Sequence, residues 1–394
     1  MPTELYLDTA RLGLISPTAK SESEAYLRIA ERESASSRFD SMLFADDTTG
    51  EVGDEFTTWS GIADLKERFR RFSGMTATSS VLLAGRTKTF ARIAARLFFG
   101  PCRNLLVTDL GWPDYIDILN SHARRLGRKV DRVALVDPVL RDRATPSDML
   151  NLIVEAYRRG NCDGLFLSAV SNTGINVDVC AIIAQLENKF DLPIVVVDGA
   201  QHLAHLPARL ADCCDFYFAS THKWLGSHLP LAVACYGQSR SQTWIDATVR
   251  RLIDYDEIDD PLLRLVEECR SDAGQFGETV NLAPLFAASG ALADAENADE
   301  LAMSSQRTNV DILGELLADC GWQPLLPNDH FRSGILLAES NRLRGAKPSI
   351  LRNGLQQCGL AATTYENGLV RLSAPKKLLT PTDLDIVRHA FQSC

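Results

Sequence analysis

The sequence lacks an excess of basic residues: 41 lysines and arginines stand against 51 aspartates and glutamates, giving a net charge of -10 at pH 7. Nucleic acids and anionic membrane surfaces attract basic proteins, so neither is an expected partner. The sequence also has no apolar run of membrane-spanning length, and its first residues, MPTELYLDTARLG, lack the layout of a secretion signal. These absences predict a soluble, cytoplasmic protein.

Cysteine motifs are missing as well, although the chain has ten cysteines. It contains no C-x-x-C pair, and the neighbours Cys213 and Cys214 disfavour a simple bridge. Cys180, Cys235 and Cys358 lie in apolar stretches, where cysteine is most simply a small buried hydrophobe. We therefore expect a reducing compartment, no disulfide framework and no metal site.

A G-x-G-x-x-G phrase after an early strand is also absent, which counts against a nicotinamide-binding protein. The apolar content of 45% and charged content of 23% are ordinary for a globular protein. Because 394 residues exceed what one hydrophobic core usually holds, we expect two domains.

What the sequence does contain is an unusual stretch from residue 194 to residue 223. Residues 194–197 are all β-branched and apolar, which predicts a strand buried on both faces, and this strand ends at Asp198. A helical segment is expected next, and then a second apolar strand, 215–219, which runs into S-T-H-K ending at Lys223. Open α/β sheets place ligands at the carboxyl ends of their strands. A lysine there can hold an aldehyde cofactor as an imine, and a carboxylate can keep a pyridine nitrogen protonated.

These phrases, D-G-A-Q at 198–201 and S-T-H-K-W at 220–224, together resemble the class V aminotransferase family of pyridoxal-phosphate enzymes. The resemblance spans nearly the whole chain and is strongest from residue 164 to residue 223. It implies the α/β fold type I of pyridoxal-phosphate-dependent transferases, with a mostly parallel seven-stranded sheet in a large domain, a small C-terminal α/β domain, and a homodimer with active sites at the subunit interface. The expected divisions are an N-terminal arm at 1–25, the large cofactor-binding domain at 26–255, a crossover at 256–282 and the small domain at 283–394.

The resemblance also implies a phosphate site for the cofactor. The strand at 79–85 and the helix at 86–97 meet at Gly85-Arg86-Thr87, and free N–H groups at a helix start bind anions. Thr87 matches the family phrase, whereas Arg86 departs from it and either adds charge to the phosphate grip or points at a substrate. Ser220 and His222 are expected to contact the phosphate or another part of the cofactor. Thr279 would reach the phosphate of the partner subunit, although Glu278 replaces the usual glycine before it.

Three further residues are implied to hold the cofactor ring. Trp112 stands where relatives place a ring that stacks on the pyridine, and its other interpretation is a packed loop residue. Asn172 and Gln201 would donate to the phenolic oxygen of the cofactor and so tune its imine. The other interpretation of Asn172 is an Asx turn before a glycine.

Two arginines are expected to bind the substrate. Arg371 lies in R-L-S, which resembles the family phrase whose arginine forks onto the α-carboxylate of an amino acid, and a planar guanidinium suits a planar carboxylate. Arg11 either contacts an acidic group of the substrate or is a local structural arginine. His228 lies near Lys223 without an assigned role, and its two interpretations are an acid–base group and a structural histidine.

The type of reaction is the least determined feature. Desulfurases need a nucleophilic cysteine shortly before the carboxylate arginine, and no cysteine lies between Leu360 and Arg371. An aminotransferase acting on an amino acid, in specialised metabolism, is the first prediction. The alternatives are a lyase of the C–S or kynureninase type and an epimerase. A catalytically silent binding protein is a further alternative, but it would not need Lys223, Asp198 and Arg371 together.

Overall fold

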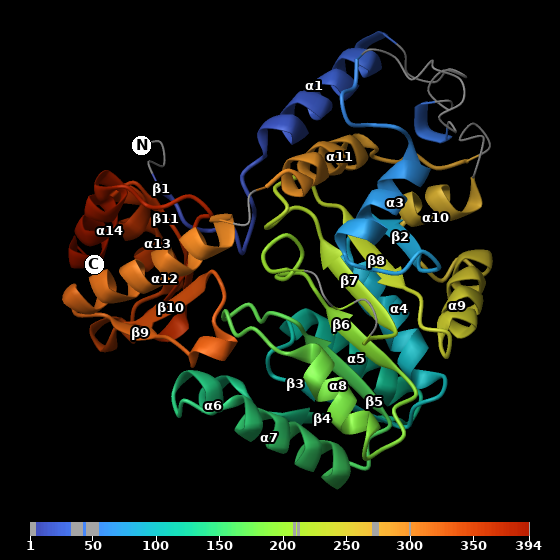
Figure 1. The fold of residues 1–394 in the computed structure, drawn as a ribbon, viewed down its shortest axis with the longest axis horizontal. Helices are drawn as coiled ribbons and strands as arrows, with labels where there is room; N and C mark the ends of the chain where they lie inside the picture. Colours follow the sequence, from blue (N-terminus) through green and yellow to red (C-terminus); the bar gives the residue numbers. More distant parts are fainter. Residues whose placement is uncertain are drawn as a thin grey trace.

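The computed structural model describes residues 5–32, 42–44, 55–207, 210, 213–269, 276–298 and 301–393. Its main feature is a seven-stranded sheet in the larger of two lobes (Figure 1). In spatial order the strands are β2 (Ser80–Ala84), β8 (Ala232–Tyr236), β7 (Phe216–Ser220), β6 (Val195–Asp198), β5 (Gly164–Ser168), β3 (Asn104–Thr108) and β4 (Lys129–Val133). Only β8 runs antiparallel to its neighbours, so the predicted mostly parallel sheet is confirmed.

Helices cover both faces of this sheet, which explains why its central strands are apolar throughout. The alternation of side chains along β6 divides them between two cores: Val195 and Val197 lie in one, Ile194 and Val196 in the other. The second core contains α4 (Thr87–Phe99), α5 (Pro113–Arg125) and α9 (Gln242–Asp254). The first contains α3 (Ile62–Phe72), α7 (Pro146–Arg159), α8 (Val179–Glu187) and α10 (Pro261–Glu268), and α6 (Val136–Leu140) also joins it.

The smaller lobe has its own core and an antiparallel sheet, at the left of Figure 1. Its strands, in spatial order, are β12 (Thr363–Tyr365), β13 (Leu369–Ser373), β10 (Ile335–Glu339) and β9 (Gln323–Leu325). Its helices are α12 (Leu301–Asp319), α13 (Pro348–Gln357) and α14 (Pro381–Ser393), with single 3₁₀ turns at Asp329–Phe331, Asn341–Leu343 and Glu366–Gly368. The N-terminal arm joins this lobe through β1 (Leu5–Tyr6), which pairs in parallel with β11 (Leu360–Ala361).

The packing of two helices, α1 and α11, does not follow the domain boundaries that the sequence predicts. The helix α1 (Pro17–Arg32) starts inside the predicted arm and lies beside α11 (Ala283–Glu296), as Figure 1 shows. Leu285 and Phe286 of α11 are fully buried in the first core of the large domain. The apolar surface of α11 therefore belongs with the large domain, and the packing of the small domain starts with α12 rather than at residue 283.

Two predicted helical stretches also differ. After Asp198 we expected a helical segment, but residues 199–206 form successive turns, in which Ala204 has a positive φ of 58° that an α-helix cannot accommodate. The charged stretch 250–270 was expected to be helical, and it forms parts of α9 and α10. Asp260, the N-cap of α10, accepts a hydrogen bond of 3.1 Å from Leu263 N, so a new helix starts there.

The expectation that the chain has no disulfide is wrong. Cys180 at the start of α8 and Cys213 before β7 are bonded, with their Cα atoms 5.3 Å apart. The pairing joins Cys213 to a distant residue rather than to its neighbour Cys214, which the sequence spacing did not reveal. No helix among the described residues is long and apolar enough to cross a membrane.

Candidate active site

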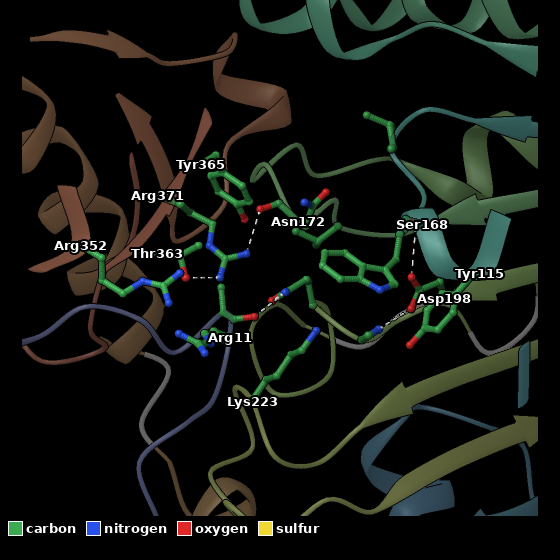
Figure 2. A pocket seen from close by; sticks show the side chains of 16 residues that line it. Arg11, Tyr115, Ser168, Asn172, Asp198, Lys223, Arg352, Thr363, Tyr365 and Arg371 are labelled. Atoms are coloured by element: carbon green, nitrogen blue, oxygen red, sulfur yellow. Dashed lines mark hydrogen bonds between the residues drawn. The ribbon is translucent and has the colours of Figure 1, made fainter. Parts of the chain in front are cut away.

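A cavity of about 340 Å³ opens where the large sheet, the N-terminal arm and the small lobe meet. Strands β5 and β6 end at its floor, the turn after β7 supplies one side, and β12 and β13 of the small lobe supply another (Figure 2). Seven residues predicted from the sequence line it: Arg11, Trp112, Asn172, Asp198, Gln201, Lys223 and Arg371. The tertiary structure therefore brings together residues that are up to 360 positions apart, counting from Arg11 to Arg371.

Asp198 forms one end of the cavity, and its carboxylate is held by hydrogen bonds. Its Oδ1 accepts from Ala200 N at 2.9 Å, and its Oδ2 accepts from the hydroxyl of Ser168 at 3.3 Å. Burial raises the pKa of Asp198, while these hydrogen bonds and the charge of Lys223 act in the opposite direction. A buried carboxylate of this kind favours a cationic partner, such as a protonated ring nitrogen.

Lys223 reaches the same cavity from the turn after β7 (Figure 2). The pKa of its amine is lowered to about 8, mainly by burial; the charge of Asp198 opposes this shift and the positive charge of Arg371 adds to it. A larger fraction of the amine is therefore neutral near pH 7 than in an exposed lysine. Neutral amines are nucleophiles, so this environment suits covalent attachment of an aldehyde.

The N-terminal arm fixes the backbone of the lysine turn. Gly13 N donates to His222 O at 2.7 Å, and Ser16 N donates to Gly226 O at 2.9 Å. A Cβ at Gly13 would lie 2.0 Å from Lys223 O, so glycine is needed for this approach. His228, which the sequence left unassigned, places its Nδ1 3.0 Å from Gly13 O on the same arm, which favours its structural interpretation.

Arg371 is buried at the side of the cavity opposite Asp198 (Figure 2). Its Nη1 donates to Asn172 O at 3.3 Å, and its Nη2 lies 3.4 Å from Oδ1 of Asp8 and 3.2 Å from the hydroxyl of Thr363. Its Nε is buried without a hydrogen-bond partner. Buried donors of this kind are usually satisfied, so Arg371 is oriented by the protein with one donor left for a ligand.

The side chain of Gln201, which was predicted to contact the cofactor, already makes two hydrogen bonds within the protein. Its amide nitrogen donates to Ala10 O at 2.7 Å, and its oxygen accepts from the indole of Trp224, also at 2.7 Å. His205 stacks on Trp224 with ring centroids 3.6 Å apart. One amide hydrogen of Gln201 remains for a cofactor oxygen, so its predicted contact stays a prediction, as does that of Asn172 on the opposite wall.

A second cavity, of about 690 Å³, borders the predicted phosphate loop. It is lined by Gly85, Arg86 and Thr87, which span the end of β2 and the start of α4, and by His222 and Thr279. Burial lowers the pKa of His222 to about 4, with the positive charges of Lys223 and His228 adding to the effect. Its Nδ1 is buried and without a hydrogen-bond partner. The Nδ1 of His222 suits an anion such as a phosphate, whereas Asp259 and Asp260 also line this cavity and Gly85 N already donates to Asp260.

Ser220 and Thr279, two residues predicted to contact the cofactor phosphate, are not shown by the structure to do so. The hydroxyl of Ser220 is buried and donates to Ala200 O at 3.4 Å, and Ser220 lines neither cavity. Thr279 borders the phosphate loop of its own chain, while Glu278 beside it forms an ion pair with Arg264 at 2.6 Å. Contact of Ser220 with the cofactor, and of Thr279 with a partner subunit, stay predictions.

The sequence analysis missed three residues at these cavities. Tyr115 lines the first cavity and donates its hydroxyl to that of Thr87 at 2.6 Å, which joins the two cavities. Asp260 accepts from Gly85 N at 3.0 Å and from the hydroxyl of Thr89 at 2.6 Å, which ties α10 to the phosphate loop. Arg352 on α13 also lines the first cavity. For Tyr115 a signal existed: it follows Trp112 by three residues, and this spacing puts both on one face of a helix start.

Comparison with known proteins shows which family part of the chain resembles. Residues 50–228, which carry the phosphate loop, Asp198 and Lys223, match the model of the family described as Aminotransferase class-V. The match covers less than half of the 394 residues, and this part of the chain is similar to that family. No curated protein matches the sequence.

Solved structures similar to this chain share its fold at low sequence identity. A cysteine desulfurase from Escherichia coli is 19% identical with a TM-score of 0.68, over 98% of this chain and 93% of that one. An alanine–glyoxylate aminotransferase from Nostoc sp. is 14% identical with a TM-score of 0.67, over 100% and 95%. A cystine C–S lyase, C-DES, solved with cysteine persulfide, is 15% identical with a TM-score of 0.71, over 98% and 96%. These likenesses confirm the predicted fold type.

The chain is a pyridoxal-phosphate-dependent transferase or lyase, and the residues present fit that cofactor. The buried carboxylate of Asp198 suits the ring nitrogen, and the amine of Lys223, with its lowered pKa, suits the aldehyde. The unpartnered Nδ1 of His222 and the start of α4 at Thr87 suit the phosphate. Among the described residues no cluster of His, Cys, Asp and Glu side chains could hold a metal ion.

Proposed function

We propose that this chain acts at Cα of a small amino acid as an aminotransferase. The observation that carries the proposal is the arrangement of Lys223 between Asp198 and Arg371 in one cavity (Figure 2). Asp198 would bind the cofactor ring on one side of the cavity, and Arg371 would bind the substrate carboxylate on the other side. The substrate Cα would then lie between them, near Lys223. A silent binding protein would have no use for that arrangement.

The residues divide the chemistry as follows. Pyridoxal phosphate, when bound, supplies the electron sink for a bond broken at Cα. Asp198 would keep the ring nitrogen protonated, and Arg371 would orient the α-carboxylate of the substrate through its charge and its unpartnered Nε–H. The amine of Lys223 would take a proton from Cα and deliver it to the carbon on the other side of the substrate nitrogen. Trp112 is proposed to cover one face of the ring, and its side chain at the cavity wall supports this role.

The walls of the cavity also bear on the alternatives. The residues that line it include no cysteine, and the β12–β13 connection before Arg371 consists of Glu366, Asn367 and Gly368. A cysteine desulfurase needs a thiol at that place, so this mechanism is disfavoured. A lyase that cleaves the side chain without a thiol is the second candidate, favoured by the C–S lyase among the structural neighbours.

The deciding experiment follows the absorbance of the holoenzyme while single amino acids are added. For an aminotransferase, the aldehyde absorbance of the bound cofactor falls without release of ammonia, and a keto acid restores it. For a lyase, ammonia and a keto product are released over many turnovers while the cofactor keeps its aldehyde. Lys223→Ala is the negative control, and Lys377→Ala, an exposed lysine, is the matched control. If no amino acid produces either result, the proposal is wrong.

A homodimer is part of the same proposal, with Thr279 contributing to the phosphate site of the partner subunit. Exposure of Thr279 beside the phosphate loop supports a role at that site. Light scattering of the purified holoenzyme should give twice the chain mass of 43.3 kDa. A monomer that binds pyridoxal phosphate normally would contradict shared sites.

A further inference from the structure

The substrate cavity contains more positive charge than the proposed chemistry uses. Of the described residues that line it, four are cationic and Asp198 is the one acid. Lys223 is used for the cofactor aldehyde, Arg371 for the α-carboxylate, and Asp198 for the ring nitrogen. Two guanidinium groups are left without a role, those of Arg352 and Arg11.

Arg352 is the more informative of the two because it has no acceptor for its Nε–H among the residues that the structure describes. Its Nε is buried without a hydrogen-bond partner, and no described carboxylate pairs with it. The two buried arginines of the described residues are paired: Arg68 lies 2.9 Å from Glu296, and Arg371 lies 3.4 Å from Asp8. Arg352 is half-buried, and its buried Nε, left unpaired at a cavity wall, points to a ligand as its acceptor.

The position of Arg352 separates it from the cofactor. Figure 2 shows its side chain directed toward Thr363 and Arg371, on the opposite side of the cavity from Tyr115 and Asp198. The cofactor phosphate is expected beyond Tyr115, at Thr87, to which the tyrosine is hydrogen-bonded. The phosphate therefore cannot be the anion that Arg352 binds, and the acceptor must come from the substrate.

Arg371 cannot serve both anions. Its two Nη atoms already donate to Asn172 O, Asp8 and Thr363, which fixes its plane and leaves Nε free. The α-carboxylate of the substrate would use the donor that remains, the Nε–H of Arg371. A second anionic group of the same substrate thus requires another cation, and Arg352 lies next to Arg371 on the same wall.

Arg11 extends this positive field to the mouth of the cavity. Its side chain is 57% exposed, and its closest approach to Asp8 is 4.0 Å. An exposed cation at an entrance attracts anions and speeds their association, an effect that salt screens.

We propose that the substrate is an amino acid whose side chain carries a second negatively charged group, and that Arg352 binds this group. The inference rests on the proposed function and names its substrate class. The shared chemistry is an anionic side chain, which a carboxylate, a sulfonate or a phosphate can supply. Arg352 determines specificity by donating charge-assisted hydrogen bonds to the anionic group, whereas a neutral amide is a poorer acceptor.

The test measures binding and turnover in the holoenzyme. By calorimetry, succinate should bind about 10- to 100-fold more tightly than succinamate, which replaces one carboxylate by an amide, because a charge-assisted hydrogen bond has that value. Arg352→Gln should remove this difference, and Arg352→Lys should restore part of it. Arg342→Gln, an exposed arginine just before α13, is the matched control and should leave it unchanged.

The same variants are then compared with amino acids. L-Aspartate, L-cysteate and O-phospho-L-serine distinguish a carboxylate, a sulfonate and a phosphate, and L-asparagine is the neutral reference. We expect kcat/KM of the preferred acid to fall by about 10- to 100-fold in Arg352→Gln, with L-asparagine changed by less than about 3-fold. Arg11→Gln should mainly reduce the salt dependence of kcat/KM.

Equal binding of succinate and succinamate by the wild type, or equal weakening of both in Arg352→Gln, overturns the anionic subsite. That failure is distinct from failure of the proposed function. If neutral amino acids change the cofactor absorbance in the wild type while acids have no advantage, the enzyme is confirmed and only the subsite is lost. If no amino acid changes the absorbance, the function itself is wrong, and the subsite that rests on it falls too.

Discussion

The hydroxyl of Tyr115 donates a hydrogen bond of 2.6 Å to the hydroxyl of Thr87, and this bond joins the substrate cavity to the phosphate loop. Tyr115 lies in the first turn of α5 and Thr87 starts α4, so one bond orders two helix N-termini at the carboxyl edge of the sheet. The ring of Tyr115 packs edge-on against Phe218 of β7, 5.6 Å between centroids, which fixes its direction. The phosphate loop therefore depends on a tyrosine that is distant in sequence.

Replacement of Tyr115 by phenylalanine tests this dependence. Loss of one buried hydrogen bond is worth about 1 kcal/mol, so the Kd for pyridoxal phosphate should rise by roughly 3- to 10-fold. Titration of the apoenzyme by absorbance gives this constant. Tyr255→Phe, at a tyrosine that is 73% exposed, is the control and should bind the cofactor as the wild type does. An unchanged Kd for Tyr115→Phe would show that Thr87 is ordered without the tyrosine.

The lowered pKa of Lys223 predicts a pH-dependent stability of the apoenzyme. Between the folded pKa of about 8 and the ordinary 10.5, the unfolded state binds more protons, so the free energy of unfolding rises with pH in that range. Lys223→Met removes a buried charge and should stabilise the apoenzyme near pH 7 by up to about 3 kcal/mol. The gain should shrink as the pH rises from 8 to 10.5.

Urea unfolding at several pH values measures this difference. The exposed Lys377→Met should follow the wild-type curve throughout. A stability gain for Lys223→Met that stays constant from pH 7 to 10.5 would contradict a lowered pKa for this amine.

Asp198→Asn separates cofactor binding from catalysis. The amide keeps the size of the side chain but no longer favours a protonated ring nitrogen, so kcat should fall by roughly 10³-fold or more. Retention of the cofactor, measured by its absorbance after dialysis, should change far less. Asp142→Asn, at an exposed aspartate, serves as the control. Near-normal kcat in Asp198→Asn would remove Asp198 from the mechanism.

Gly13→Ala tests the contact between the arm and the lysine turn. The added Cβ would lie 2.0 Å from Lys223 O, and backbone atoms must shift to admit it. We expect destabilisation of about 1–3 kcal/mol, seen as a lower Tm, together with a reduced kcat. Gly345→Ala adds the same methyl group where no atom lies within 4 Å, and it should be close to neutral. Equal Tm values for the two variants would show that the arm does not restrain the turn.

The sequence by itself determined the strands of the large sheet and the reactive residues at their carboxyl ends. The apolar strands at 195–198 and 216–220 are local patterns, and Asp198 and Lys223 follow directly from where those strands end. Arg371 was found through a short phrase on a strand of the small lobe, because a carboxylate clamp needs that residue type. Each of these residues is specified by its neighbours in the chain, and periodicity and motif therefore sufficed.

Only the tertiary structure decided which further side chains meet at the site. Tyr115, Asp260 and Arg352 lie on ordinary helix starts and helices, and their partners are fixed by how distant elements pack. The same holds for α11, whose apolar face fits either lobe by composition and is placed in the large one by contact with α1. Pairing of Cys180 with Cys213 is a further case. Local sequence sets the conformation of a segment, whereas the partner of a side chain is set by the energy of packing segments together.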